Sequence, residues 1–270
     1  MEKFSILMSV YKNDRPEWLR QAFDSVIDQT RILDDVVVVL DGPVSNGIEN
    51  VLDGVKNSFD SFQIVRLSEN VGLGRALSKG LNYVKNSLVA RIDADDISVD
   101  NRFEIQLNEF SHNQGLAITS GAISEFKHDV DEKMTIKNMP LMHDEICEYS
   151  KLRNPFNHPA VMFRKEMVQQ VGSYQHFPLF EDYHLWVRML NSGMKTSNVP
   201  EILVNMRVGA GLYNRRGGVN HLLNAIKLRK EFQAWGWISR LEALKANLAM
   251  TVITLMPSAL RKMLYTQALR

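Results

Sequence analysis

The sequence predicts an α/β fold with a mostly parallel sheet, helices on both faces and a helical C-terminal appendage. Through residues 4–92, short apolar runs alternate with amphipathic segments, a rhythm typical of parallel strands joined by helices. One run, VVVVL at residues 36–40, is apolar throughout, as are central strands buried on both faces. With 270 residues, 45% hydrophobic and 23% charged, the chain can bury a substantial core.

The first half of the chain is predicted to alternate four strands with three helices. The first helix follows the first strand, and from Leu19 its apolar residues have the spacing of a helix that packs on a sheet. Asp14 is expected to cap this helix, with Pro16 in the first turn. The strands are expected at residues 4–10, 36–40, 63–67 and 88–92, and the two later helices at 48–59 and 73–84.

The second half of the chain has a less regular pattern. Its predicted elements are a helix at 100–112, a strand or hairpin at 116–126, a loop at 127–142, a short strand at 160–163, and helices at 165–171 and 182–192. The last two helices are each stopped by a glycine, Gly172 and Gly193. The tail is predicted to be helical at 221–235 and 239–256, with a last helix opened by Pro257.

Polar side chains follow three of the predicted strands where each strand ends. Asp41 follows the second strand, Asn70 lies just beyond the third, and Asp93 follows the fourth. In parallel sheets, ligands bind beyond the carboxyl ends of the strands. We therefore expect these three residues to line one ligand-binding crevice.

The segment DADD at residues 93–96 holds three aspartates directly after a predicted strand. Carboxylates two residues apart can converge on an oxygen-preferring cation such as Mg²⁺ or Mn²⁺, which can also hold nucleotide phosphates. The alternative is an acid-rich helix start, which Asp96 or Asp100 fits, because the helix dipole favours acids there. The preceding strand and Asp41 on a neighbouring strand favour a metal and nucleotide site.

Two side chains are candidates for contact with a nucleotide base. Asp41 can accept a hydrogen bond from the ring N–H of a pyrimidine or guanine, and Tyr11 can stack on the base. An ordinary Asp-Gly turn and a core tyrosine are the structural alternatives. Considered alone, Asp41 is better explained by the turn and Tyr11 by a position in the core.

Three further residues are candidates for contact with phosphate. Asn70 opens the segment NVG before a helix, where backbone N–H groups can face phosphate, although a plain strand-to-helix turn fits equally well. Arg75 and Arg91 can neutralise phosphate or hold the aspartates in place. Ordinary ion pairing is the alternative for both arginines.

A second acidic pair, Glu181 and Asp182, opens a predicted helix. A helix start can point a carboxylate into the crevice as a general base, whereas simple complementarity with the helix dipole is the alternative. His158, in the segment NPFNHP, is a candidate site residue or metal ligand. A hydrogen-bonded core histidine is the favoured alternative there.

Composition limits the setting in which the protein works. The single Cys147 excludes an internal disulfide and a cysteine cluster for zinc, and favours a reducing compartment. The N-terminal residues lack the features of a secretory signal, and the apolar stretch 246–256 is about half of the roughly 20 residues that span a bilayer. We therefore expect a cytoplasmic protein, soluble or bound to a membrane surface.

Six segments together resemble family-2 inverting glycosyltransferases, especially the bacterial enzymes that build O-antigen, capsule and exopolysaccharide. These are SVYKND, LDG, NVGLGRALSKG, ARIDADDISVDNRFEIQ, NPFNHPAVMFRK and FEDYHLWVRML. The resemblance covers residues 4–207 and implies the GT-A fold at 1–210. It implies a Rossmann-like nucleotide-sugar-binding half at 1–112 and an acceptor-binding half at 113–210, before a basic amphipathic tail at 211–270.

The resemblance also implies roles for single residues. Nucleotide-sugar-binding roles fall on Tyr11, Asp41, Asn70, Arg75, Arg91, Asp93 and Asp95. Asp93 matches the first aspartate of the D-x-D motif, near the ribose, and Asp95 matches the aspartate that binds Mn²⁺ or Mg²⁺. Asp182 matches the catalytic base. Further donor or acceptor contacts are expected from His158, Glu181 and Asp96.

The implied reaction moves galactose or glucose from a UDP-sugar to a hydroxyl of a lipid-linked, polyprenyl diphosphate saccharide, forming a β-linkage. Rhamnose transfer from dTDP-rhamnose is the alternative. A sugar nucleotidyltransferase would need a glycine-rich basic loop after the first strand, and residues 9–14 hold no glycine. A non-catalytic nucleotide-binding module is a further alternative, against which intact Asp93, Asp95 and Asp182 argue.

The tail carries most of the chain's positive charge. Residues 215–270 hold ten lysines and arginines against two glutamates, within a whole-chain net charge of +1. Trp235, Trp237 and Leu241 are among the apolar residues that interleave with this charge, as in interfacial helices. We expect docking on the anionic cytoplasmic face of the inner membrane. The alternative is a hairpin packed on the domain or on a second subunit in a homodimer, and nucleic-acid binding is not expected.

Overall fold

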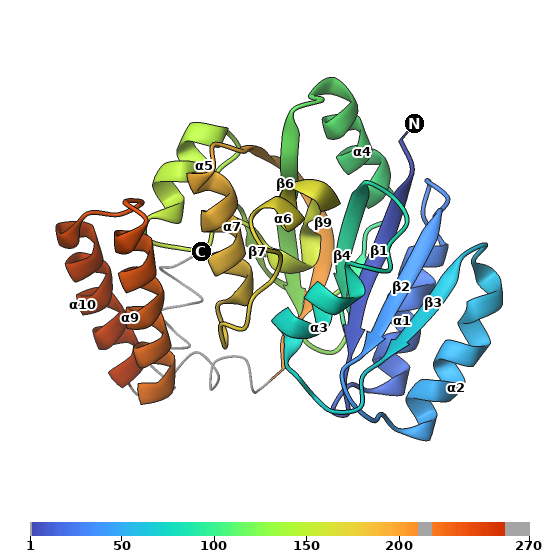
Figure 1. The fold of residues 1–270 in the computed structure, drawn as a ribbon. Coiled ribbons are helices and arrows are strands. Elements are labelled where there is room, and N and C mark those ends of the chain that lie inside the picture. The colour runs from blue at the N-terminus through green and yellow to red at the C-terminus, as the bar shows by residue number, and fades with distance from the viewer. Residues whose placement is uncertain (1, 210–217, 257–270) are drawn as a thin grey trace.

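The computed structural model describes residues 2–209 and 218–256, whose nine strands form one curved mixed sheet flanked by helices (Figure 1). The sheet order is β3-β2-β1-β4-β8-β6-β9-β5, and β7 pairs with β6. The strands are β1 (Phe4–Val10), β2 (Asp35–Leu40), β3 (Phe62–Arg66), β4 (Leu88–Asp93), β5 (Ile97–Ser98), β6 (Leu116–Phe126), β7 (Lys133–Lys137), β8 (Met162–Arg164) and β9 (Lys195–Arg207). The helices are α1 (Pro16–Ile27), α2 (Asn46–Val55), α3 (Leu73–Gly80), α4 (Arg102–His112), α5 (His143–Ser150), α6 (Lys165–Gln170), α7 (Glu181–Asn191), α9 (Val219–Ala234) and α10 (Arg240–Leu255).

The predicted β-α alternation is confirmed in the first half of the chain. Strands β3, β2, β1 and β4 pair in parallel, and Ser9 near the end of β1 lies beside Asp93 at the end of β4. The second half is mixed, because β8 pairs antiparallel with both β4 and β6, while β6 and β9 are parallel. Parallel pairing therefore brings the carboxyl ends of the first four strands to one edge.

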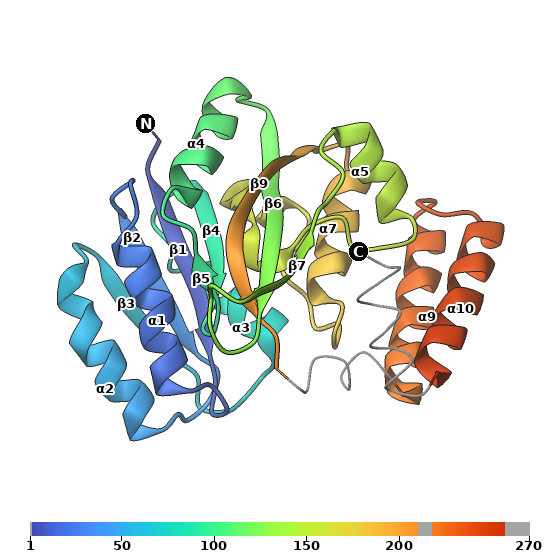
Figure 2. The ribbon, with the colours of Figure 1, turned by 180° about the vertical axis from the view of Figure 1, so that it is seen from behind.

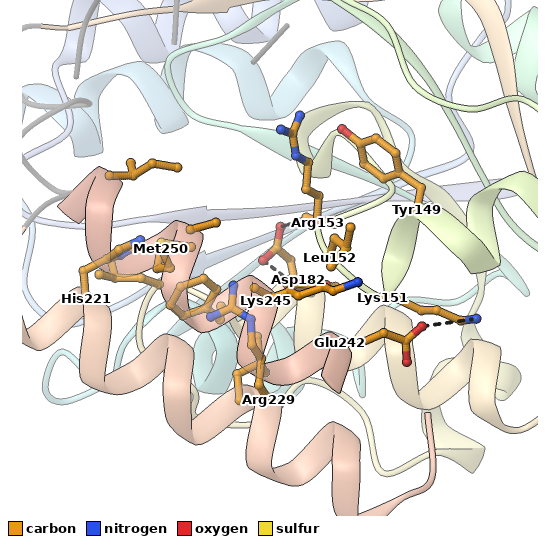
Figure 3. A pocket seen from close by; sticks show the side chains of 18 of the residues that line it. Tyr149, Lys151, Leu152, Arg153, Asp182, His221, Arg229, Glu242, Lys245 and Met250 are labelled. Atoms are coloured by element: carbon orange, nitrogen blue, oxygen red, sulfur yellow. Dashed lines mark hydrogen bonds and ion pairs between the residues drawn. The ribbon is translucent and has the colours of Figure 1, made fainter. Parts of the chain in front are cut away.

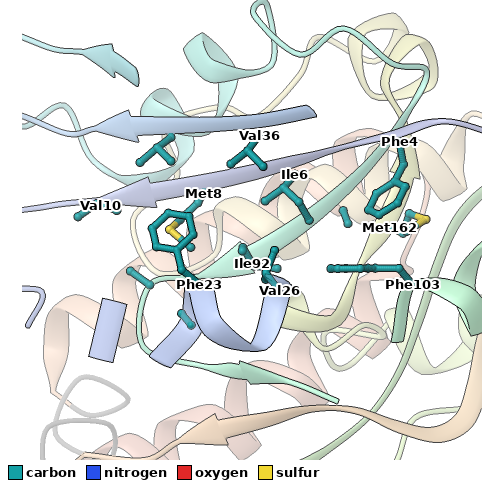
Figure 4. Close-up of a cluster of buried hydrophobic side chains, with 14 of the residues drawn as sticks. Phe4, Ile6, Met8, Val10, Phe23, Val26, Val36, Ile92, Phe103 and Met162 are labelled. Atoms are coloured by element: carbon teal, nitrogen blue, oxygen red, sulfur yellow. The ribbon is translucent and has the colours of Figure 1, made fainter. Parts of the chain in front are cut away.

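Helices cover both faces of the sheet, as the sequence predicts. On one face, α1, α2 and α4 pack on a cluster that includes Phe4, Ile6 and Met8 of β1 (Figure 4). On the other face, α3, α6 and α7 pack on a cluster built around Leu7 and Trp186 (Figure 2). Alternate residues of β1 therefore face opposite cores, which is why the strand is apolar nearly throughout.

Two local expectations are wrong, and one strand was not expected. Asp14 does not cap α1; Arg15 is the N-cap residue, and the Asp14 carboxylate instead accepts a hydrogen bond from the backbone N–H of Tyr11. The expected loop at 127–142 contains β7, whose KMTIK sequence has the two-residue period of a strand. Strand β9 was not expected, because Pro200 interrupts its pattern; the β6–β9 register shifts at this point.

The tail forms an antiparallel hairpin of α9 and α10 beside α7 (Figure 1). Phe232 and Leu228 of α9 pack with Tyr183 of α7 in a buried apolar cluster. Trp235 packs against this cluster and the Trp237 ring N–H donates to the Ser150 hydroxyl at 3.1 Å, so both tryptophans contact the domain, as the packed-hairpin alternative expects; docking of the tail on a membrane stays a prediction. The helix expected after Pro257 lies outside the described residues.

Two further observations bear on the membrane expectation. Within residues 2–209 and 218–256, no helix combines the length and hydrophobicity needed to cross a bilayer. The side of α10 that faces solvent carries Leu241, Leu244, Leu248 and Val252, each 55–63% exposed. We call these four residues the apolar stripe.

Candidate active site

The aspartates of the DADD segment lie where β4 ends and the chain turns. Asp93 is the last residue of β4 and forms an ion pair through both carboxylate oxygens with Arg91, a fully buried arginine two residues earlier. Arg91 therefore holds Asp93 in place, as one sequence interpretation proposed. Asp95 lies in the following turn and forms no comparable ion pair within the described residues.

Asp95 and Asp14 carry charge that the surrounding protein does not fully compensate. Burial, and then the charge of Asp93, raise the pKa of Asp95 to about 6. Burial, and then the charges of Asp95 and Asp93, raise the pKa of Asp14 to about 7. The hydrogen bond from the Tyr11 backbone N–H acts in the opposite direction and lowers it. Asp14 therefore belongs to this site. It lies in the segment SVYKND just after the carboxyl end of β1, a position from which it could have been assigned to the crevice instead of a helix cap.

The chemistry of these oxygens fits a divalent cation. Among the described residues, no group of three histidine, cysteine or acidic side chains forms a closed metal cage. Mg²⁺ and Mn²⁺ sites that serve nucleotides need only one or two carboxylates, because phosphate oxygens and water complete the coordination. A cation would also stabilise the charged forms of Asp95 and Asp14, whose pKa values are raised by burial and by the neighbouring aspartates.

Asp96 is buried and serves the turn itself. Its carboxylate accepts a hydrogen bond from the Arg207 backbone N–H at 2.8 Å, and the Arg207 side chain donates to the Asp95 backbone carbonyl at 3.1 Å. These two hydrogen bonds from the end of β9 thus fix the position of the aspartate turn. A contact of Asp96 with a donor sugar stays a prediction.

Asp41 and Asn70 meet at the neighbouring strand ends. The two Asp41 oxygens accept hydrogen bonds from the backbone N–H groups of Val71 and Gly72 at 2.7 and 3.0 Å, and the Asn70 amide donates to the Asp41 carbonyl. Gly72 has a φ of +88°, which glycine adopts without strain. Asp41 therefore shapes the loop before α3, and base recognition by its carboxylate stays a prediction.

The remaining nucleotide candidates differ in exposure. Tyr11 is half-buried, and its backbone N–H donates to the Asp14 carboxylate. Arg75 is exposed in the first turn of α3. Their contacts with a nucleotide stay predictions.

Asp182 lies in the first turn of α7 and is half-buried. One carboxylate oxygen accepts a hydrogen bond from the Asn154 side-chain amide at 2.6 Å, and the other accepts from the Tyr183 backbone N–H at 2.7 Å. Burial nevertheless raises the pKa of Asp182, against these two bonds and the nearby charge of Arg91. An oriented carboxylate with a raised pKa has the properties of a general base.

Glu181 and His158 lie close to the same arginine. Burial and the charge of Asp182 raise the pKa of Glu181 to about 7. Burial and the charge of Arg91 lower the pKa of His158 well below its usual value, so the ring is neutral. His158 forms a hydrogen bond of 3.0 Å with the Tyr174 hydroxyl and packs edge-on against Trp186, which matches the core-histidine interpretation.

Arg91 links the two acidic groups that the sequence singled out. Its charge acts on Asp95 at one end and on Glu181 and Asp182 at the other, although these segments are far apart in the chain. The structure therefore brings the DADD turn and the acidic helix start into one site.

A cavity of about 860 Å³ opens beside Asp182 (Figure 3). Its walls come from the turn after α5, the start of α7 and the α9–α10 hairpin. Polar lining residues include Asn154, Arg153 and Lys245, and apolar ones include Met250. The sequence did not reveal this cavity, because its walls are contributed by residues from 137 to 253.

A mixed sheet of this topology, with acidic residues at the carboxyl ends of its parallel strands and an oriented carboxylate beside a cavity, is typical of the GT-A class of nucleotide-sugar-dependent glycosyltransferases. Residues 5–172 match the profile of Glycosyl transferase family 2. The chain belongs to this family, and it is a glycosyltransferase.

Two relatives align over nearly their whole length. The amylovoran biosynthesis glycosyltransferase AmsE of Erwinia amylovora is 36% identical over 97% of this chain and 97% of its own. The UDP-Gal:alpha-D-GlcNAc-diphosphoundecaprenol beta-1,3-galactosyltransferase of Escherichia coli is 35% identical over 99% of this chain and 97% of its own. These relatives extend the similarity through the tail.

Two solved structures share the fold at low sequence identity. S. aureus TarS 1-349 in complex with UDP-GlcNAc has a TM-score of 0.62 and 14% identity, over 84% of this chain and 65% of that one. The Pyrobaculum calidifontis mannosyltransferase PcManGT, in complex with GDP-Man and Mn²⁺, has a TM-score of 0.61 and 16% identity, over 100% of this chain and 81% of that one. At these identities the likeness establishes the fold.

Proposed function

We propose that the protein transfers a hexose, galactose in the first place, from a UDP-sugar to a hydroxyl of a lipid-linked saccharide in bacterial surface polysaccharide synthesis. Both the UDP-galactose donor and the diphosphoundecaprenol-linked acceptor are named for the Escherichia coli relative. Glucose as the transferred sugar and dTDP-rhamnose as the donor remain the alternatives. Family membership argues against the nucleotidyltransferase and the non-catalytic module.

Asp182 carries the proposed chemistry. Its carboxylate takes the proton of the acceptor hydroxyl, whose oxygen attacks the anomeric carbon on the face opposite the leaving UDP. The bond from that carbon to the phosphate oxygen breaks, so the configuration inverts and a β-linkage forms. The observation that supports this role is the oriented, half-buried carboxylate with a raised pKa at the wall of the cavity.

The donor is proposed to bind in the crevice of the first half, residues 1–112, with the acceptor on the second half, residues 113–210. Asp95, with Asp93 and Asp14 beside it, would hold Mn²⁺ or Mg²⁺. A bound cation would offset the charge that grows on the leaving diphosphate. Removal of the metal by EDTA should abolish transfer, and Mn²⁺ or Mg²⁺ should restore it; full activity in EDTA would exclude this role.

The base assignment is tested by Asp182→Asn. Transfer should fall about 10²- to 10⁴-fold, the usual contribution of a general base. Binding of UDP, measured by calorimetry, should be unchanged, because Asp182 does not belong to the donor crevice. Asp53→Asn, an exposed change on α2, is the matched control. Transfer at the wild-type rate in Asp182→Asn would show that another residue acts as the base.

The transferred sugar is tested with a panel of UDP-galactose, UDP-glucose and dTDP-rhamnose against a lipid-diphosphate GlcNAc acceptor. Release of UDP with formation of a β-linked disaccharide is expected from UDP-galactose. Turnover from dTDP-rhamnose alone would reject the UDP-sugar proposal.

The tail is proposed to dock on the cytoplasmic face of the inner membrane through the apolar stripe. Four exposed aliphatic side chains on one side of α10, with exposed Lys245 and Arg240 nearby, are the pattern of an interfacial helix. Leu244→Glu with Leu248→Glu should abolish flotation with anionic liposomes. Unchanged flotation would reject the stripe as the contact, and a dimer that dissociates in this variant would support the homodimer alternative.

A further inference from the structure

Helix α10 presents different chemistry on three sides. At about 100° per residue, the apolar stripe occupies one side, and Glu242, Ala246 and Ile253 line the cavity on a second side. The third side is buried against α9, where the Arg229 guanidinium of α9 donates to the Asn247 side chain of α10. Lys245 lies between the stripe and the cavity side, so it occupies the rim that joins them.

The cavity holds more positive charge than its own acids neutralise. Lys151 is already paired with Glu148 and Glu242, at 2.7 and 3.8 Å. Arg153 and Lys245 also line the cavity, and neither forms an ion pair or a side-chain hydrogen bond with the rest of the described chain. Figure 3 shows both side chains around the same space as Asp182, from separate segments of the chain. Two cations free to bind an anion therefore lie beside the proposed base.

We propose that this cavity is the acceptor site and that Arg153 and Lys245 bind the diphosphate that links the acceptor saccharide to its lipid. The inference rests on the proposed function and adds to it the site and the residues. An arginine and a lysine suit a diphosphate, because guanidinium and ammonium groups form charge-assisted hydrogen bonds with phosphate oxygens.

The order of the chemistry along the protein matches the order along such an acceptor. The acceptor is apolar at one end, anionic in the middle and a sugar at the other end. The protein offers the apolar stripe, then the exposed Lys245 and Arg153 along the cavity wall, then Asp182. Arg153 is next in sequence to Asn154, whose side-chain amide donates to the Asp182 carboxylate, so one hydrogen bond links the diphosphate contact to the base.

The test compares two acceptors in detergent micelles, one with GlcNAc linked to an alkyl chain through a diphosphate, the other with GlcNAc linked to the same chain without phosphate. In the double variant Arg153→Gln/Lys245→Gln, the KM for the diphosphate acceptor should rise roughly 10- to 100-fold. The KM values for the neutral acceptor and for the nucleotide sugar should stay unchanged. Lys227→Gln/Lys230→Gln removes two exposed cations of α9 outside the cavity and is the matched control.

An unchanged KM for the diphosphate acceptor, an equal loss with both acceptors, or an equal loss in the control variant would overturn the proposal. Binding of the diphosphate acceptor without donor, followed by tryptophan fluorescence, separates this proposal from the proposed function. If the wild type transfers sugar to neither acceptor, the proposed function fails. Weakened binding in Arg153→Gln/Lys245→Gln would still support the cavity, and unweakened binding would refute it.

Discussion

The hydrogen bond from Asn154 to Asp182 should set the pH at which the enzyme works. The Asn154 amide donates at 2.6 Å to one carboxylate oxygen, which stabilises the charged form and lowers the pKa of Asp182. Asn154→Ala removes this donor but leaves the Tyr183 backbone N–H on the other oxygen. The pKa of Asp182, already raised by burial, should therefore rise further.

The size of this shift follows from the energy of the bond. A hydrogen bond to a charged group contributes about 1.5–3 kcal/mol, and one pKa unit corresponds to about 1.4 kcal/mol. The acid limb of kcat should thus move about one to two pH units higher in Asn154→Ala. Because a base must be deprotonated to act, activity should be lost below this limb and recovered above it.

The assay is UDP release at saturating donor and acceptor between about pH 5.5 and 9, where a limb raised above the reference aspartate pKa can be followed. Asn82→Ala, which changes an exposed asparagine beyond α3, is the control. An acid limb that stays at the wild-type pH in Asn154→Ala would refute the reasoning, because the base would then be a group that Asn154 does not contact.

Three further predictions concern stability. The pKa of Glu181 is raised from 4.5 to about 7, so the wild type loses stability as the pH rises from about 4.5 to about 7. Glu181→Gln should therefore be more stable by up to about 3 kcal/mol at pH 8 and no more stable at pH 4, by thermal unfolding. A difference that does not change with pH would contradict this. Gly80→Ala would bring a Cβ to 2.7 Å from Leu7 Cδ1, so it should lower the free energy of unfolding, measured in urea, by about 1–3 kcal/mol. An unchanged free energy of unfolding would mean that the neighbouring core side chains can move to make room. Phe232→Ala should lower the free energy of unfolding by about 3–5 kcal/mol, and a protease should cleave the α9–α10 hairpin before it cleaves the sheet. Cleavage of both at the same time would show that the hairpin and the sheet unfold together.

The elements that could be predicted from sequence are those whose burial follows a regular pattern. Strand β2 is buried at every position and α1 buries one side, so an unbroken apolar run and a helical spacing were sufficient. Strand β9 mixes buried, half-buried and exposed positions without a two-residue period, it carries Pro200, and its pairing with β6 requires a register shift. Such a strand is defined by its partner, which sequence periodicity does not reveal.

The candidate site also has a part that could be predicted from sequence and a part that could not. The DADD segment and the acidic pair at 181–182 were visible because each is a local pattern at a predicted strand or helix end. Asp14 was assigned to a helix cap, since capping and binding favour the same residue type at the same position. The cavity depends on how the α9–α10 hairpin packs on α7, and its charged lining has no local signature.

The ion pair between Arg91 and Asp93 affects how mutagenesis of the D-x-D motif should be interpreted. Removing one partner of a buried pair leaves an uncompensated charge, which typically costs about 3–5 kcal/mol. Asp93→Asn would do this to Arg91, so an inactive variant could simply be unfolded. Asp95→Asn removes a carboxylate whose charge is disfavoured by burial, so the fold gains from its neutralisation. Genetic evidence for metal dependence should therefore come from position 95, with position 93 serving as a probe of folding.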